Sequence, residues 1–349
     1  MIRKLLIFAI LALVITSCRD EYVIDDLQDP SKIVAYCFPT AGDTTLIRLS
    51  RSIPVQHLND PSTSQTPFVV SYSLNGEPQN VVPTDDEGTY LVIASQQEGD
   101  AVSLSAAAEG LESVTAQTQI PSPCPIQIDT IRRVQLYDSS YEEFRNFVQV
   151  KASFQDDGSA TNYYAVRLIV RNDIGYDKFY QLNDQGDTIA SGYGTMNYEY
   201  LLEDYPDFTH EIHIQEQTYM QPELYIGSEP VLSNLTDIDK EMGFEDEFYQ
   251  GFYIFNDELF NGRSYTITLN AVASSVRNRD ALFQYAQVEL YQLTPECYHY
   301  FKSLNDMRNN NLAQMGFAQA SPIISNVTNG IGIVGGYSMT KSSFKIIKP

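Results

Sequence analysis

The first third of the chain alternates apolar and polar residues with a period of two. Between residues 32 and 122 it contains "KIVAYCF", "TTLIRLS", "FVVSYSL", "GTYLVIA", "AVSLSAA" and "ESVTAQTQI" in succession. Alternation of this kind puts successive side chains on opposite faces of a strand. The segments "TAGD", "LNGEP" and "TDDEG" between the runs carry turn-forming residues. The pattern predicts six or seven strands in a β-sandwich of the immunoglobulin or fibronectin type over residues 32–122.

A proline-rich segment, "IPSPCP", separates this region from a second one that begins at residue 123. Proline interrupts strand pairing, so the segment marks a domain boundary. Period-two patterning returns in "QIDTIRRVQLY", "FVQVKASFQD", "NYYAVRLIVRN", "RSYTITLNAVASSV" and "FQYAQVELYQL". We therefore predict a mainly all-β chain in which residues 123–349 form a larger β-rich domain. A helix is expected near residues 295–307 and long loops between residues 172 and 262.

The N-terminus "MIRKLLIFAILALVITSC" has the features of a bacterial secretory signal. Its apolar run from Leu5 to Ile15 follows two basic residues and is shorter than the about 20 residues of a membrane-spanning helix. The small residues before Cys18 match a lipobox, in which the cysteine is acylated. We therefore expect residues 1–17 to be removed, with Cys18 as the lipidated first residue. An ordinary signal peptide with a coincidental cysteine is the alternative.

The residues after the cysteine predict where the protein is displayed. Arg19, Asp20 and Glu21 resemble the acidic export tag that directs Bacteroidota lipoproteins to the outer face of the outer membrane. They begin a polar tether over residues 18–31. Several acyl chains on one cysteine provide stable anchoring to membrane lipid. We expect an outer-membrane protein that faces the cell exterior, with the periplasmic face as the alternative.

The charge of the chain limits its partners. It carries 22 basic and 45 acidic residues, a formal net charge of −23. Such a surface repels nucleic acid, so no nucleic-acid partner is expected. Tyrosine is abundant at 24 residues, whereas tryptophan is absent. Tyrosine suits interfaces because one end of the ring is apolar and the other is polar.

Three cysteines remain after the lipobox, and an oxidising compartment permits a disulfide between two of them. Cys37 and Cys124 bracket the first region and are the preferred pair, although sequence alone does not fix the connectivity. Cys297 would then stay unpaired. It is either a reactive thiol at a helix N-terminus or, because Phe301 and Leu304 continue an apolar helical face from it, a small core residue, and we favour the second.

Two segments invite a metal interpretation. His210 and His213 lie three apart in "HEIHI", and in a strand these positions point to opposite faces, which argues against a zinc site. A weak calcium candidate consists of Asp237, Asp239 and Glu241. The residue after it is Met242, where an EF-hand loop requires glycine.

Catalytic motifs give no positive signal. The chain has no G-x-S-x-G nucleophile elbow, and no pair of its acidic residues stands out as a glycosidase pair. Function has to be argued from a site, so we expect neither enzymatic activity nor a cofactor. A hydrolase with dispersed carboxylates is retained as an alternative.

The segment "NGIGIVGGYS" matches the dinucleotide fingerprint G-x-G-x-x-G at Gly330, Gly332 and Gly335. That fingerprint needs a helix directly after it and an acidic residue about 20 positions further on. Only thirteen residues follow Gly336, and they provide neither. The four glycines are therefore predicted to be bends or close contacts of a late strand.

These motifs together resemble a known family. The lipobox, "LIRLSRSIPV", the proline bridge into "IDTI", "FNDELFNGRSYTITL", "YHYFKSLN" and "SPIISNVTNGIGIVGGYS" are similar to the Bacteroidota lipoproteins catalogued as domain of unknown function 4249. The resemblance spans nearly the whole chain and brings no catalytic residues with it. It implies a genomic position beside TonB-dependent outer-membrane transporters, and hence an accessory role in uptake.

We therefore expect a surface lipoprotein that helps a TonB-dependent barrel to capture its ligand. The expected ligand or partner surface is the tyrosine-rich segment that contains Tyr198, Tyr200 and Tyr205. A stand-alone adhesin or glycan-binding module is the main alternative, because tyrosines can also stack on sugars.

Overall fold

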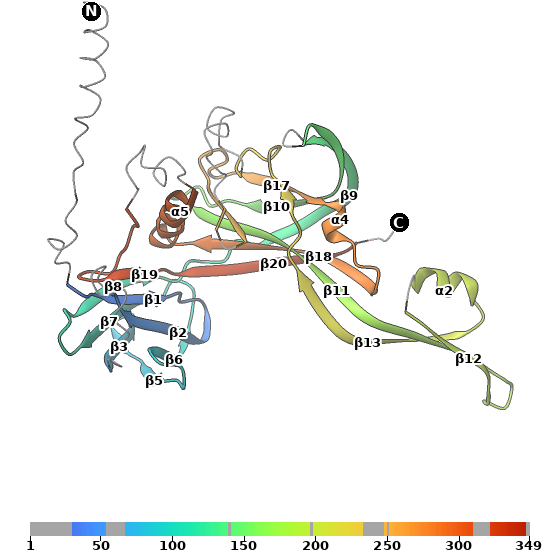
Figure 1. Ribbon diagram of the computed structural model, residues 1–349, viewed down its shortest axis with the longest axis horizontal. Coiled ribbons are helices and arrows are strands. Elements are labelled where there is room, and N and C mark those ends of the chain that lie inside the picture. The colour runs from blue at the N-terminus through green and yellow to red at the C-terminus, as the bar shows by residue number, and fades with distance from the viewer. Residues whose placement is uncertain are drawn as a thin grey trace, which may run out of the picture.

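The computed structural model describes residues 30–53, 67–138, 141–195, 198–232, 248–249, 251–309 and 322–346. In this part of the chain two β units lie next to each other, and a three-stranded arm extends from the second unit (Figure 1). This architecture confirms the predicted mainly β fold. The lipidation and export residues Cys18, Arg19, Asp20 and Glu21 lie outside the described residues, as do the calcium candidates Asp237, Asp239 and Glu241.

The N-terminal unit is a sandwich whose strands match the alternating runs. Its strands are β1 (Ile33–Cys37), β2 (Gly42–Arg51), β3 (Phe68–Leu74), β4 (Glu77–Pro78), β5 (Asn80–Pro83), β6 (Thr89–Gln96), β7 (Ala101–Ala108), β8 (Val114–Gln119) and the late strand β19 (Ile331–Val334). One sheet has the order β4-β3-β7-β8 and the other β19-β1-β2-β6-β5. Alternate residues of both sheets share one core, which includes Ile47, Tyr72 and Leu104.

The second unit also has two sheets around one core. Its strands are β9 (Ile126–Asp138), β10 (Glu143–Gln155), β11 (Tyr163–Leu182), β12 (Thr188–Gly194), β13 (Thr209–Met220), β14 (Leu224–Tyr225), β15 (Phe248–Tyr249), β16 (Phe252–Asn256), β17 (Ser264–Val272), β18 (Ala281–Leu293) and β20 (Tyr337–Ile346). One sheet has the order β14-β17-β10-β9, and the other has β15-β16-β11-β18-β20. Val150, Leu168 and Leu269 are among the side chains buried between them.

The described residues include three helices beside these strands: α2 (Tyr198–Asp204), α4 (Ala273–Val276) and α5 (Pro295–Asn309). Helix α5 confirms the helix predicted near residues 295–307. Its residue Cys297 is 1% exposed, and burial raises the pKa of the thiol, so it is a core residue. No helix among the described residues is long and apolar enough to cross a membrane.

The glycine-rich ending joins the two units. Strand β19 pairs in parallel with β1, whereas β20 begins three residues later and pairs with β18 of the second unit. The backbone at Gly332 has a φ of +109°, and a Cβ there would lie 2.0 Å from the carbonyl oxygen of Ala35. A Cβ at Gly336 would lie 1.9 Å from the carbonyl oxygen of Gln119. These residues therefore serve close backbone packing, as predicted for a late strand.

The expectation of long loops is wrong for residues 172–220. Strand β11 runs for 20 residues, and its second half continues beyond the sheet as the centre of the arm. β13 pairs with it on one side and β12 on the other, and α2 connects these two strands (Figure 1). Polar residues Asn172, Asp173 and Asp177 occupy buried positions of β11, so the sequence of this stretch lacks a clear alternation of apolar and polar residues.

The preferred disulfide between Cys37 and Cys124 is also wrong, because both are free thiols. Cys37 lies in the core of the N-terminal sandwich, whereas Cys124 lies in the core of the second unit. The two residues bracket the first unit in sequence but are packed into different cores. Burial raises the pKa of Cys37 to about 12 and that of Cys124 to about 11, as expected for inert core thiols.

Candidate functional site

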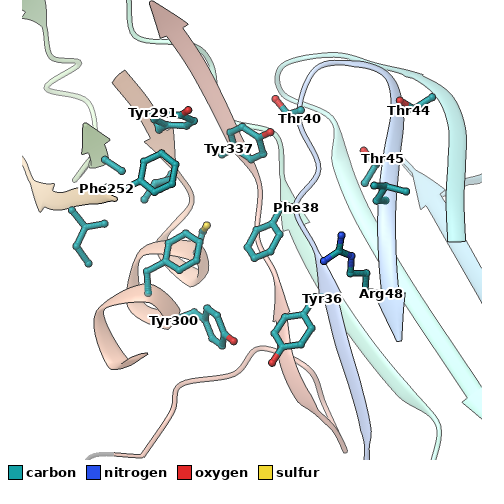
Figure 2. A pocket seen from close by; sticks show the side chains of 16 residues that line it. Tyr36, Phe38, Thr40, Thr44, Thr45, Arg48, Phe252, Tyr291, Tyr300 and Tyr337 are labelled. Carbon is teal, nitrogen blue, oxygen red and sulfur yellow. The ribbon is translucent and has the colours of Figure 1, made fainter. Parts of the chain in front are cut away.

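The main candidate site is a cleft of about 780 Å³ between the two units. One wall is the outer surface of β1 and β2, and the opposite wall consists of β16, β18, α5 and the start of β20 (Figure 2). Seven aromatic side chains line it: Tyr36, Phe38, Phe252, Tyr291, Tyr300, Phe301 and Tyr337. The volume lies within the range of about 300–1,000 Å³ that is usual for small-molecule sites.

The aromatic residues contact one another across the junction of the two units. Phe38, directly after β1, stacks on Phe301 from α5 with 5.7 Å between ring centroids, and Tyr36 meets Tyr300 edge to face at 6.3 Å. The backbone N–H of Tyr337 donates to the carbonyl of Pro39 at 3.1 Å. These contacts hold the walls together at the base, so the cleft is part of a packed interface rather than a gap between independent domains.

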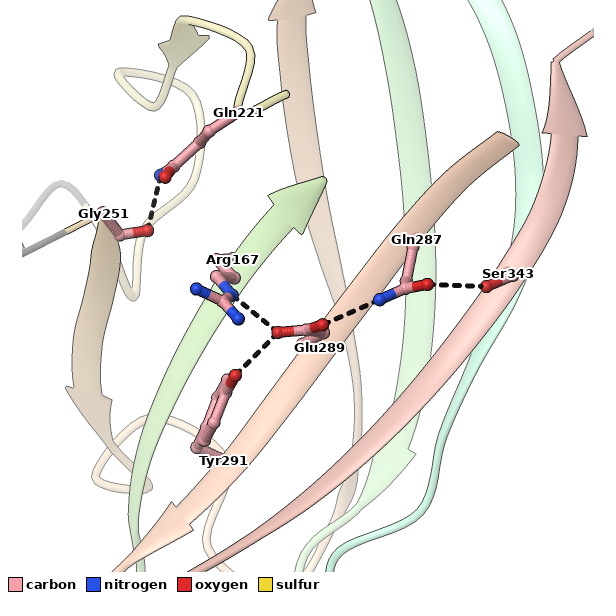
Figure 3. A network of polar contacts seen from close by, with 7 residues as sticks. All are labelled: Arg167, Gln221, Gly251, Gln287, Glu289, Tyr291 and Ser343. Carbon is pink, nitrogen blue, oxygen red and sulfur yellow. Dashed lines mark hydrogen bonds and ion pairs between the residues drawn. The ribbon is translucent and has the colours of Figure 1, made fainter. Parts of the chain in front are cut away.

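A buried ion pair supports the wall that faces β1. The carboxylate of Glu289 accepts hydrogen bonds from Arg167 Nε at 2.6 Å, Tyr291 Oη at 2.6 Å and Gln287 Nε2 at 2.7 Å (Figure 3). The guanidinium of Arg167 also lies 4.7 Å from the ring centroid of Phe252. The pair therefore positions two aromatic side chains of the cleft, Tyr291 and Phe252.

Glu289 stays charged in spite of its burial. Its side chain is 6% exposed, and burial raises the pKa of the carboxyl. The hydrogen bonds from Tyr291 and Arg167 and the charge of Arg167 lower the pKa by more, so the net value is below the ordinary one. Three side chains hold the charged carboxylate in place, so Glu289 acts as a structural anion in this wall.

A second candidate site is the face of the arm opposite α2, which we call the open face of the arm. Tyr176 in β11 stacks on His213 in β13 at 5.0 Å and meets Tyr193 in β12 edge to face at 5.4 Å. Lys178 and Glu211 lie beside them, 3.9 Å apart. Tyr193 is 68% exposed. An exposed face of tyrosine, histidine and charged residues has the composition of a protein interface.

The three tyrosines predicted to form a ligand or partner surface, Tyr198, Tyr200 and Tyr205, do not lie together on one exposed face. Tyr198 and Tyr200 lie in α2, and Tyr205 follows it, on the other face of the arm. Tyr205 stacks on Phe179 at 4.5 Å, and Tyr198 packs edge to face on Phe283 at 5.4 Å. Tyr200 remains 55% exposed. Tyr198 and Tyr205 therefore attach α2 and the residues after it to the sheet and the arm, whereas Tyr200 stays exposed, and the three rings do not form one stacking platform.

His210 and His213 are separated as the strand pattern predicts. His210 faces α2, where Nδ1 lies 2.6 Å from Asp177 Oδ2 and Nε2 lies 2.9 Å from the carbonyl oxygen of Tyr205. Burial lowers the pKa of His210, but these two hydrogen bonds and the charge of Asp177 raise it by more. The described residues contain no cluster of three or more His, Cys, Asp or Glu side chains that could hold a metal ion.

Replacing Asp177, which is completely buried, by asparagine should lower the pKa of His210, because the negative hydrogen-bond partner is lost. NMR titration of the histidine ring signals measures this, with His210→Gln identifying the signal. The raised pKa also means that protonated His210 stabilises the fold below its ordinary pKa of 6.5 and loses this effect as the pH rises through the folded-state value. The wild type should therefore exceed His210→Gln in stability more at pH 5.5 than at pH 8. An unchanged His210 titration in Asp177→Asn would show that Asp177 does not raise the pKa of His210.

Sequence analysis missed the cleft, although a signal existed. Tyr36 in β1 and Leu46 in β2 occupy outward positions, where a free-standing sandwich carries polar residues, and Phe38 follows directly after β1. Leu46 is 49% exposed in the cleft. An apolar outer face of a sandwich strand indicates a neighbour or a ligand, but the sequence does not say which elements form the opposite wall.

The fold and cleft define an all-β, two-unit protein with a ligand-sized aromatic site at the junction of its units. The chain belongs to the family described as domain of unknown function DUF4249, whose model matches residues 19–343. This match confirms the resemblance carried by the sequence motifs. No curated protein matches the chain.

Two solved structures show weak similarity. The adhesin InvE of Yersinia pseudotuberculosis is 12% identical with a TM-score of 0.17, over 75% of this chain and 55% of that one, so this chain spans about half the length of that adhesin. The C-terminal domain of the Streptococcus agalactiae AgI/II polypeptide BspA is 10% identical with a TM-score of 0.13, over 75% of this chain and 96% of that one. At these TM-scores neither structure informs the fold or the function of this chain.

Proposed function

We propose that this chain is a lipid-anchored outer-membrane protein that captures a small ligand and passes it to a TonB-dependent barrel transporter. The observation that carries the proposal is the aromatic cleft between the two units. A largely preformed, mostly apolar cleft of this volume suits a small molecule. Capture is favoured over catalysis because the described residues that line the cleft include no Asp, Glu or His, and its cysteine is a buried thiol with a raised pKa.

The arm supplies a surface for the barrel. Figure 1 shows the arm extending away from the first unit, so a partner can contact its open face without covering the cleft. The exposed Tyr193 and the stacked Tyr176 provide apolar anchors, and Lys178 and Glu211 provide a polar rim. The proposal includes anchoring through acylated Cys18 and display on the cell exterior, which put the protein beside the outer end of such a barrel.

Copurification from outer membranes in mild detergent tests the proposal. Wild-type protein with a C-terminal tag should bring down a barrel protein in stoichiometric amount. The double variant Tyr176→Ser, Tyr193→Ser should recover at least about tenfold less barrel, because aromatic anchors dominate interface energy. Its thermal unfolding midpoint should change little, since surface substitutions cost within about 0.5 kcal/mol each.

The matched control is Tyr137→Ser, which removes a tyrosine that is 50% exposed on β9, outside the arm. This variant should recover as much barrel as the wild type. Absence of any stoichiometric barrel with the wild type would overturn the proposal and favour the stand-alone adhesin. Equal recovery with the arm variant would place the docking surface elsewhere on the molecule.

A further inference from the structure

The cleft contains a positively charged side chain among its aromatic residues. Among the described residues that line it, Arg48 is the one with a charged side chain. It belongs to the outward face of β2 together with Thr44 and Leu46, and its guanidinium points toward Tyr36 and Phe38 (Figure 2). The cleft therefore combines aromatic faces with one cation.

Nothing in the described part of the chain uses this cation. The neighbours of Arg48 in the sheet are Tyr36 on β1 and Thr89 on β6, both neutral. No ion pair or hydrogen bond joins its guanidinium to another described residue, whereas Arg145, Arg167 and Arg171 each pair with a carboxylate. The guanidinium of Arg48 is exposed, so a ligand in the cleft can reach it.

We propose that the cleft binds a molecule with a flat ring body and an anionic group, most simply a carboxylate, which pairs with Arg48. The inference rests on the proposed capture function and specifies its ligand class. The rings lie against the tyrosine and phenylalanine side chains, and the planar guanidinium donates charge-assisted hydrogen bonds to the carboxylate. The net charge of −23 makes the bulk of the protein repel anions, so a local cation is needed to bind one.

A pair of isosteric probes tests the inference: 2-naphthoate, which is anionic, and 2-naphthamide, which is neutral. Both should bind wild-type protein in a fluorescence anisotropy titration, and the naphthoate should bind at least about fivefold more tightly because its hydrogen bonds are charge-assisted. The preference should weaken with added salt, since Arg48 is exposed. Arg48→Gln should remove the preference while the amide still binds.

Two controls make the outcomes distinct. Arg51→Gln removes an exposed arginine from the end of the same strand, outside the cleft, and should leave the preference intact. Leu46→Ser changes the exposed apolar residue of the wall and should weaken the binding of both probes equally.

Equal binding of the two probes to wild type, or an unchanged preference in Arg48→Gln, overturns the ligand class but leaves the capture function standing. If neither probe binds the wild type, both the proposed ligand class and the proposed capture function are overturned.

Discussion

Gly332→Ala is expected to be among the most destabilising single substitutions in this protein. The added Cβ would meet the carbonyl oxygen of Ala35 at 2.0 Å, and the φ of +109° is one that residues with a Cβ rarely adopt. Strain of this kind costs about 1–3 kcal/mol, and the clash adds a similar amount. A loss of about 3 kcal/mol or more in the free energy of unfolding should appear in a urea titration followed by circular dichroism.

A matched glycine separates the two causes. Gly99 also has a positive φ of +85°, but a Cβ there meets nothing within 4 Å. Gly99→Ala should therefore cost only the backbone strain, about 1 kcal/mol. If Gly332→Ala and Gly99→Ala have equal effects, the close packing of β19 against β1 does not contribute to stability.

Gly332→Ala should also change the shape of the cleft. Strand β1 and the residue after it carry Tyr36 and Phe38 on one wall, and its neighbour β19 leads into Tyr337 on the other. A displaced β19 would change the distance between the walls. Gly332→Ala should therefore weaken the naphthoate probe at temperatures where the variant is still folded, whereas Gly99→Ala should not.

The strands of both units could be predicted because the alternation of apolar and polar residues is a local signal. "TTLIRLS" lies in β2 and buries alternate residues, whereas "FVQVKASFQ" lies in β10, where residues 147–150 are all buried and alternation follows them. The helix start was also local, since Thr294 and Pro295 are typical cap and first-turn residues. None of these inferences needed knowledge of distant parts of the chain.

What the sequence did not reveal depends on pairing between distant residues. Val34 pairs with Ile331, and no local pattern connects a strand near the start of the chain with a glycine-rich segment near its end. The cleft also depends on distant residues, because its lining comes from β1, β2, β11, β16, β18, α5 and β20. The position of Arg48 in a cleft could therefore not be predicted from the sequence, because the opposite wall consists of residues far away along the chain.

Replacing Arg167 should also lower the stability of the protein strongly. Arg167→Met leaves the buried carboxylate of Glu289 without its cation and takes the guanidinium away from Phe252. Breaking a buried pair costs about 3–5 kcal/mol, and because the side chain of Arg167 is 29% exposed we expect about 2–3 kcal/mol at pH 7. The loss should be measured as a shift in the urea midpoint, with a parallel loss of probe binding because Tyr291 and Phe252 lose their support.

The pH dependence of this loss gives a sharper test. The folded-state pKa of Glu289 lies below its ordinary value of 4.5, so the pair stabilises the fold above that value and ceases to do so as the pH falls through the folded-state pKa. The difference between wild type and Arg167→Met should therefore be largest near pH 7 and shrink below pH 4.5. Lys178→Met is the control, because its pair with Glu211 is about half exposed on both sides and contributes under about 1 kcal/mol. A loss in Arg167→Met that is the same at pH 7 and at pH 3.5 would show that the Arg167 side chain contributes through packing alone, and that the charge of Glu289 does not hold the cleft wall.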